Sequence, residues 1–202
     1  MIQYSIDADG IAVLAWDMPG GANIINADAV AAFSYAMEQA LGDPVVKGIV
    51  VSSAKDTFIL GGDLKALYAL ADVAEVMLLG RAIHKLFRRM ETGGKPVVAA
   101  INGMVLGGGM ELALACHHRV AVNSPSVQLG FPEVTLGLFP GAGGTQRLPR
   151  LIGLQPAMQP LLMGRNMDVA EAKALKIVGT VVDTQDALIP AAKQWILNGG
   201  KA

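Results

Sequence analysis

The sequence has little charge, few aromatic side chains and only one cysteine. Of its 202 residues, 16% are charged and 5% are aromatic, whereas 52% are hydrophobic. The mean hydropathy is +0.45. Such a composition excludes an intrinsically disordered chain and favours a large buried core. The length suits one domain of ordinary size and is short for two.

No excess of one charge sign is present, since the formal net charge is −1. This balance gives no electrostatic footprint for DNA or RNA, so no nucleic-acid partner is expected. Basic residues gather only in two segments, Arg81–Arg89 and Arg147–Arg150. Each segment is either a solvated helix face or a patch for a small phosphorylated ligand, and both alternatives stay open.

The lone Cys116 excludes an intrachain disulfide and favours a reducing compartment, so a cytoplasmic location is expected. The first ten residues have neither a basic start nor a long apolar stretch, which argues against a signal peptide. The most apolar window, Pro96–Cys116, is long enough to raise the question of a membrane span. Asn102, Glu111 and several glycines interrupt it, so a buried strand, turn and helix is predicted instead.

Several common site motifs are missing. No Gly-Lys-Ser/Thr follows a glycine-rich turn, and the dinucleotide spacing Gly-x-Gly-x-x-Gly is absent at residues 107–112. No serine lies in a Gly-x-Ser-x-Gly turn. His117 and His118 are adjacent at a predicted helix end without further ligands, so no metal site is expected. Cys116 is interpreted as a small buried apolar residue.

Strand and helix patterns alternate along the chain. This order predicts an α/β fold with a mostly parallel sheet. A hairpin is expected near the N-terminus, because Asp9-Gly10 separates two β-rich runs. Strands are expected at 2–6, 11–16, 45–51, 96–101 and 119–122, and helices at 27–42 (capped by Asn26), 72–91 and 111–116, after the turn at 56–67, and within 140–153, 168–175 and 186–197.

Two glycine turns share one pattern, Leu-Gly-Gly-Asp at 60–63 and Leu-Gly-Gly-Gly-Met-Glu at 106–111. Each follows an extended segment and opens a helix. Glycine lets a ligand approach the main chain closely, and a helix N-terminus offers unpaired N–H groups. Two such turns can aim two donors at one oxygen, as in an oxyanion hole. The alternative is that both are only tight turns in a packed protein.

Two glutamates stand in apolar surroundings, Glu111 in MELALAC and Glu133 in GFPEVTLG. Carboxylates in such settings are rarely buried without a partner or a purpose. A pair of them suits general acid–base chemistry, in which one takes a proton and the other gives one. They are 133 − 111 = 22 residues apart, so only the fold can make them a pair.

These segments together resemble a known family. INGMVLGGGMELALACHHRVAV and LGFPEVTLGLFPGAGGTQRLPRLIG resemble the crotonase superfamily of enoyl-CoA hydratases and isomerases, and FILGGDLKAL resembles its first oxyanion segment. The resemblance implies a crotonase-like spiral of ββα units, with residues 1–202 as a single domain.

WDMPGGANIINADAV is similar to the N-terminal hydratase module of bacterial multifunctional fatty-acid oxidation α subunits. This closer resemblance implies that the C-terminal helical portion is incomplete here. It also implies that the dehydrogenase domain found downstream in those subunits is absent from this sequence.

The resemblance also implies roles for individual residues. The backbone N–H groups of Gly62 and Gly108 would hold the thioester oxygen. Glu111 would help to deprotonate a water that attacks Cβ, and Glu133 would deliver a proton to Cα. Gly141 would add a backbone contact near this water. Lys65 is either a ligand for a coenzyme A phosphate or a solvated lysine.

The function implied is an enoyl-CoA hydratase that adds water to a trans-2-enoyl-CoA in fatty-acid β-oxidation. The alternatives are a Δ3,Δ2-enoyl-CoA isomerase in the same pocket and a non-catalytic acyl-CoA-binding fragment. No cofactor is expected beyond the coenzyme A of the substrate, and no membrane partner is expected. A homo-oligomer, or in full-length form a complex with a 3-ketoacyl-CoA thiolase, is the expected assembly.

Overall fold

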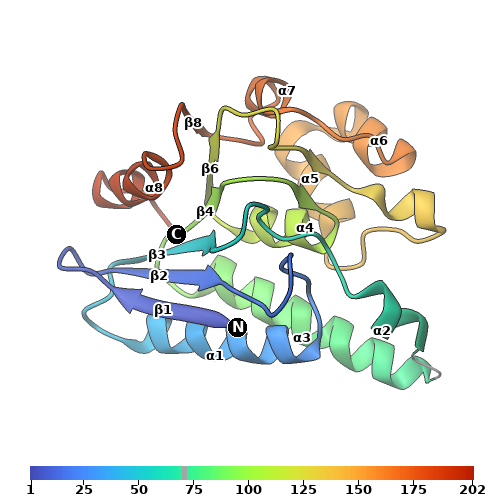
Figure 1. Ribbon diagram of the computed structural model, residues 1–202, viewed down its shortest axis with the longest axis horizontal. Coiled ribbons are helices and arrows are strands. Elements are labelled where there is room, and N and C mark those ends of the chain that lie inside the picture. Colours follow the sequence, from blue (N-terminus) through green and yellow to red (C-terminus); the bar gives the residue numbers. More distant parts are fainter. Residues whose placement is uncertain (70–71) are drawn as a thin grey trace.

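The computed structural model describes residues 1–69 and 72–202 and has a mixed six-stranded sheet at its centre (Figure 1). The strand order is β1-β2-β3-β4-β6-β8. β1 pairs with β2 in antiparallel fashion and all other neighbours are parallel, which confirms the predicted hairpin and the mostly parallel sheet. The strands are β1 (Ile2–Ile6), β2 (Ile11–Trp16), β3 (Gly48–Ser53), β4 (Val97–Ile101), β6 (His118–Val122) and β8 (Thr180–Val182).

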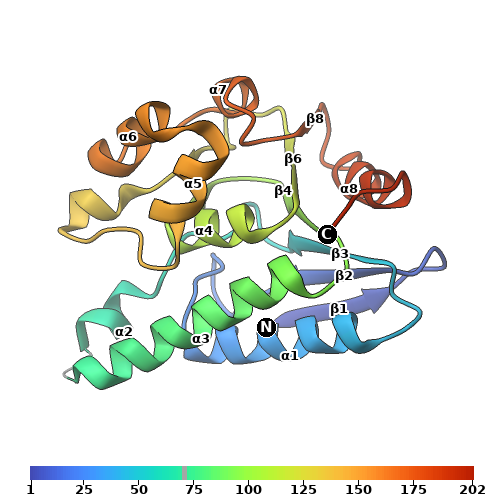
Figure 2. The same cartoon turned by 180° about the vertical axis from the view of Figure 1, so that it is seen from behind.

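Helices cover the sheet. α1 and α3 lie side by side in both views, and α8 packs against β3, β4 and β6 (Figures 1 and 2). The predicted cap Asn26 is confirmed, because its side chain accepts from the N–H of Ala29, and Asp72 caps α3 in the same way by accepting from the N–H of Ala74. The helices are α1 (Ala27–Gly42), α2 (Leu64–Ala69), α3 (Val73–Thr92), α4 (Gly108–Ala115), the 3₁₀ helix η1 (Pro132–Leu136), α5 (Gly144–Ile152), α6 (Leu154–Met163), α7 (Val169–Ala174) and α8 (Leu188–Leu197).

Some predicted boundaries were wrong. The strand predicted at 45–51 begins only at Gly48, because the N–H of Val46 bonds to the carbonyl of Asp43 in a turn after α1. The helix predicted at 111–116 begins three residues earlier, at Gly108, and Cys116 is its cap. Helix α6 was not foreseen, because prolines such as Pro160 are uncommon inside helices. The short strands β5 (Val105–Leu106), β7 (Leu129–Gly130) and β8 were also missed.

The core runs through the sheet. All of β4 and the first five residues of β3 are buried, as expected for parallel strands covered on both faces. The window Pro96–Cys116 forms a strand, a turn and a helix, as predicted. No helix in the described part of the chain is long and apolar enough to cross a membrane.

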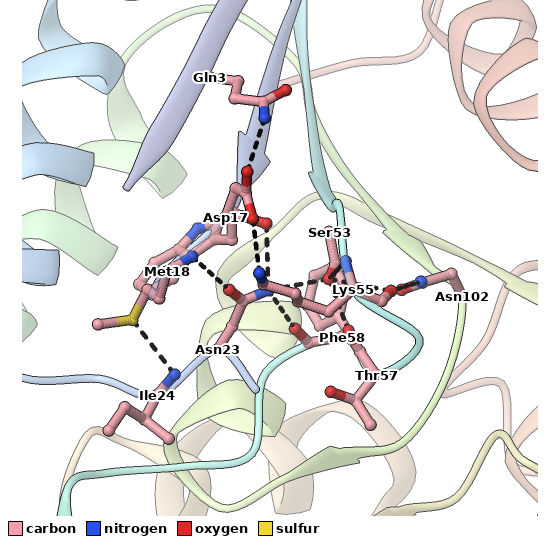
Figure 3. Close-up of polar contacts among 11 residues, drawn as sticks. Gln3, Asp17, Met18, Asn23, Ile24, Ser53, Lys55, Thr57, Phe58 and Asn102 are labelled. Atoms are coloured by element: carbon pink, nitrogen blue, oxygen red, sulfur yellow. Dashed lines mark hydrogen bonds and ion pairs between the residues drawn. The ribbon is translucent and has the colours of Figure 1, made fainter. Parts of the chain in front are cut away.

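A buried asparagine joins three segments beside the first glycine turn. Asn23 is 0% exposed, and its Oδ1 accepts from the N–H of Met18 at 3.0 Å. Its Nδ2 lies 2.8 Å from Ser53 Oγ and 3.1 Å from the carbonyl oxygen of Phe58 (Figure 3). The backbone carbonyl of Asn23 also accepts from Leu60, at the start of the turn. One side chain therefore fixes the turn relative to the ends of two strands.

We expect Asn23→Ala to lower the free energy of unfolding by about 3 kcal/mol, since it leaves buried backbone groups without partners, at about 1–3 kcal/mol each. Urea unfolding followed by circular dichroism measures this loss. Asn198→Ala, at an exposed position after α8, is the matched control and should stay within about 0.5 kcal/mol. Equal stability of the two variants would contradict the role of Asn23.

Candidate active site

The two glycine turns meet in space. A Cβ built on Gly61 would lie 3.8 Å from the backbone nitrogen of Gly108. A backbone bond from the N–H of Leu106 to the carbonyl of Ile59 reinforces this contact, and a bond from the N–H of Gly107 to the carbonyl of Gly130 ties the second turn to β7. Segments more than forty residues apart in the sequence therefore form one rigid wall.

Two backbone donors in this wall have no protein acceptor. In the described part of the chain, no hydrogen bond is made by the N–H of Gly62 or by that of Gly108. Gly108 is the first residue of α4, where N–H groups are unpaired and the helix dipole is positive. Both glycines line one pocket together with Glu133. The wall can therefore offer two donors to an oxygen that carries negative charge.

Each of the three consecutive glycines is required for a different reason. Gly107 has a φ of +53°, and a Cβ there would lie 2.9 Å from Oε1 of Glu133. A Cβ on Gly108 would lie 3.0 Å from Cδ1 of Ile25. A Cβ on Gly109 would overlap the carbonyl oxygen of Ile59. The run of glycines thus lets two backbones and one carboxylate approach each other.

Glu111 lies in the first turn of α4 and is 2% exposed. Its Oε1 accepts two backbone hydrogen bonds of 2.7 Å, from the N–H groups of Ala142 and Gly144. A Cβ on Gly144 would come within 3.1 Å of that oxygen and within 2.7 Å of the Phe131 ring. The loop before α5 thus orients the carboxylate through its backbone and needs glycine at 144 to do so.

Burial controls the ionisation of Glu111. It raises the pKa of this carboxyl, and the nearby charge of Glu133 raises it further. The N–H groups of Gly144 and Ala142 and the charge of Arg147 oppose the rise, and the resulting pKa is about 7. A carboxyl with such a pKa can exchange a proton near neutral pH.

Glu133 lies near the start of η1 and lines the pocket of the two backbone donors. Its Oε1 faces Gly107, while its Oε2 is buried and has no hydrogen-bond partner in the described residues. Burial raises the pKa of this carboxyl as well. The fold thus brings together the two carboxylates that the sequence separates by 22 residues. A buried oxygen without a partner is what a site awaiting a polar ligand would show.

Comparisons with known proteins agree with this geometry. The sequence model of the family described as "Enoyl-CoA hydratase/isomerase" matches residues 7–198. The chain belongs to the enoyl-CoA hydratase/isomerase family. The crotonase resemblance and the predicted fold class are thereby confirmed.

Individual relatives match nearly the whole chain, but the chain spans different shares of their lengths. The fatty acid oxidation complex subunit alpha of Shewanella amazonensis is 42% identical over 195 residues, which is 96% of this chain and 28% of that protein. Among solved structures, an enoyl-CoA hydratase from Bacillus anthracis superposes with a TM-score of 0.90 at 31% identity, covering 98% of this chain and 75% of that one. An enoyl-CoA hydratase from Thermoplasma volcanium gives 0.89 at 26%, covering 97% and 77%.

Two residues implied by the family resemblance lie at exposed positions. Gly141 is exposed, and the backbone donors that reach Glu111 are those of Ala142 and Gly144 instead. Lys65 is exposed on α2, one residue after Leu64, which lines the pocket. Their suggested roles toward the water and toward coenzyme A stay predictions.

No sequence pattern singled out Ala142 and Gly144, because they act through the backbone. Arg147 was placed in a basic segment, as part of a solvated face or a ligand patch. It forms instead a 2.6 Å ion pair with Glu91 at the end of α3. Gly143, in the same loop, has a positive φ of +104°, a backbone conformation that favours glycine.

The remaining candidates have structural contacts. Cys116 is buried, as predicted, and burial raises its pKa to about 12. His117 Nδ1 accepts from the N–H of Val97, and His118 stacks on Trp195 with ring centroids 4.5 Å apart. Across the described residues, no group of three His, Cys, Asp or Glu side chains could hold a metal ion.

The glycine run can be tested by adding one methyl group. We expect Gly109→Ala to lower the free energy of unfolding by about 1–3 kcal/mol, because the new Cβ must push the two turns apart. Gly21→Ala is the matched control, since a Cβ there meets nothing within 4 Å and the residue has no positive φ. Thermal unfolding of both variants checks this, and an unchanged Gly109→Ala variant would contradict the close packing.

Proposed function

We propose that this chain is an enoyl-CoA hydratase, which adds water across the double bond of a trans-2-enoyl-CoA to give a 3-hydroxyacyl-CoA. One observation carries the proposal: the half-buried Glu133 lines a pocket with two backbone N–H groups that have no acceptor in the described residues, and the buried Glu111 lies close enough to Glu133 for the two charges to interact. Addition of water to a conjugated thioester needs a base for the water, an acid for the carbon and donors for the thioester oxygen. Glu111, Glu133 and the N–H groups of Gly62 and Gly108 can meet these three requirements in turn.

In the proposed reaction the thioester oxygen accepts from the N–H groups of Gly62 and Gly108. Glu111 takes a proton from water as the water oxygen bonds to Cβ. The electron pair of the double bond moves toward the thioester, and the negative charge that develops on its oxygen faces the two donors. Glu133 then gives its proton to Cα. Losing one such backbone donor typically raises the barrier by about 3–4 kcal/mol.

The reaction is balanced in protons without a further reactant. One turn of the cycle leaves Glu111 protonated and Glu133 ionised, and exchange of one proton through solvent restores both. The reaction is neither an oxidation nor a reduction. The proposal therefore includes no cofactor beyond the coenzyme A of the substrate.

The relatives support a wider setting for this reaction. The chain spans 28% of the length of the Shewanella amazonensis subunit, whose name places that protein in a fatty acid oxidation complex. We infer a role in fatty-acid β-oxidation, in a homo-oligomer or in a complex with a 3-ketoacyl-CoA thiolase. A cytoplasmic location belongs to the same proposal and is supported by the single, buried Cys116.

Isomerisation is a second candidate, since the family description covers isomerases as well as hydratases. A Δ3,Δ2-enoyl-CoA isomerase moves one proton within the same pocket and needs only one base. Two carboxylates with raised pKa values favour hydration. Incubation with a 3-enoyl-CoA followed by product analysis separates the two activities.

The first test is hydration of crotonyl-CoA, followed by loss of the enoyl-thioester absorbance. We expect Glu133→Gln and Glu111→Gln each to lower kcat by about 100-fold or more, the range for loss of a general acid or base. Glu75→Gln, at an exposed position of α3, is the matched control and should keep the wild-type rate.

Binding separates the remaining outcomes of this test. The Glu133→Gln variant should still bind an acyl-CoA by calorimetry, because the backbone donors are unchanged. Wild-type turnover that survives both glutamine variants would overturn the proposed roles. Acyl-CoA binding without turnover of any enoyl-CoA would instead support the non-catalytic binding fragment.

The pH dependence gives an independent test. Glu111 must be ionised to accept a proton, so kcat/KM should rise with pH and reach half of its plateau near pH 7, the pKa given by burial. Rates between pH 5.5 and 8.5 in buffers of constant ionic strength measure this limb. A rate that is already at its plateau at pH 5.5 would contradict a base with a raised pKa.

A further inference from the structure

Arg147 connects helix α3 to the loop that holds Glu111. Its Nε donates to Oε1 of Glu91 at 2.6 Å, and its Nη1 donates to the carbonyl of Ala142 at 2.9 Å. The Arg147 side chain is 18% exposed and that of Glu91 26%. A half-buried ion pair of this kind is better ordered than a surface pair and less screened by salt.

Ala142 is therefore held from both ends. Its carbonyl accepts from the guanidinium, and its N–H donates to Oε1 of Glu111 at 2.7 Å. The carbonyl and the N–H flank the Cα of one buried residue, so a displacement of Ala142 as a whole would disturb both contacts. A continuous path of short contacts thus runs from the carboxylate of Glu91 to the carboxylate of Glu111.

The residues around the Arg147 guanidinium leave space for it and contact it. Gly143 has a φ of +104°, and a Cβ there would overlap Nη1 of Arg147. The guanidinium carbon lies 5.7 Å from the centroid of the Phe87 ring. The backbone carbonyl of Glu91 lies 3.3 Å from Nε2 of His117, which ties down the end of α3.

We propose that Arg147, oriented by Glu91, is a positioning residue that fixes the 142–144 loop and so the carboxylate of Glu111. The inference rests on the proposed hydratase function, in which Glu111 is the base. Arg147 is absent from the residues that line the pocket with Glu133, and lines a separate hollow with Cys116 and Arg150. In this proposal Arg147 acts on catalysis through its hydrogen bond to the Ala142 carbonyl.

An arginine suits this role better than a lysine. The planar guanidinium presents donors in fixed directions, so it can hold the Glu91 carboxylate and the Ala142 carbonyl at once. A lysine would keep the charge but lose this two-sided grip. The two substitutions therefore separate charge from geometry.

The charged groups around the site define the expected pH effect. Glu111 faces Glu133 from η1 and Arg147 from α5, and the charge of Arg147 lowers the pKa of Glu111. Arg147 itself faces the carboxylate of Glu91 and the thiol of Cys116. Glu91 also lies 3.5 Å from Arg88, and the buried Arg119 lies near Cys116. Removal of the Arg147 charge should therefore move the rising limb of the rate profile to higher pH.

The experiment compares Arg147→Gln, Arg147→Lys and Glu91→Gln with wild type in crotonyl-CoA hydration. We expect Arg147→Gln to lower kcat by roughly 10- to 100-fold, as for a small misplacement of a reacting group, with KM unchanged within about twofold. Its rising limb should shift upward in pH. Arg147→Lys should lower kcat while keeping the wild-type limb, and Glu91→Gln should lower kcat to a smaller extent than Arg147→Gln.

Arg150→Gln is the matched control, since Arg150 lies in the same helix and, among the residues that the structure describes, forms hydrogen bonds only to Gln146. It should match wild type in kcat, KM and pH profile. A merely structural role of Arg147 would lower the active fraction, as measured by urea unfolding, without moving the pH limb. An Arg147→Gln variant with that signature, or with the wild-type kcat, would overturn the proposal.

Failure of the hydratase assignment gives a different result. In that case the wild-type chain itself would not hydrate crotonyl-CoA, whatever stands at position 147. Hydration by wild type that is abolished in Glu111→Gln but unaffected in Arg147→Gln would leave the function standing and refute the positioning role alone.

Discussion

The close approach of two glycine turns is the constraint on which the rest of this structure depends. Backbone at 60–62 can lie against backbone at 106–109 only where no Cβ intervenes, and Gly109 meets the carbonyl of Ile59 directly. This contact fixes where α4 begins. It thereby fixes the direction of the helix dipole, the free N–H of Gly108 and, one turn later, the carboxylate of Glu111. Asn23 holds the first turn in place from the other side.

Desolvation disfavours the charged forms of Glu111 and Glu133, and hydrogen bonds compensate the two carboxylates to different extents. Glu111 receives two backbone N–H groups on one oxygen, whereas Oε2 of Glu133 has no partner among the described residues. The two acids are therefore different in kind although their charges interact. Glu111 is firmly oriented, and Glu133 keeps an open position for a ligand. Such a division suits a reaction in which one group accepts a proton and the other donates it.

The sequence predicted those features that follow from local patterns. The hairpin at Asp9-Gly10, the cap Asn26 and the buried strand at 97–101 each depend on neighbouring residues, and each is confirmed. The two glutamates could be singled out because carboxylates are unusual in apolar segments. Their pairing could not, because it depends on contacts between distant segments. Ala142 and Gly144 escaped notice since their contribution comes from backbone N–H groups, which every residue except proline possesses.

Where backbone N–H groups hold a side chain, the position of that side chain depends on the position of the loop that donates them. A loop that donates two N–H groups to Glu111 must itself be rigid, and glycine at 143 and 144 makes it adaptable rather than stiff. Rigidity must then come from outside the loop. The guanidinium of Arg147 supplies it, because it binds a loop carbonyl on one side and a carboxylate anchored to α3 on the other. An arginine that reads as surface charge in the sequence thus belongs to the support of the site.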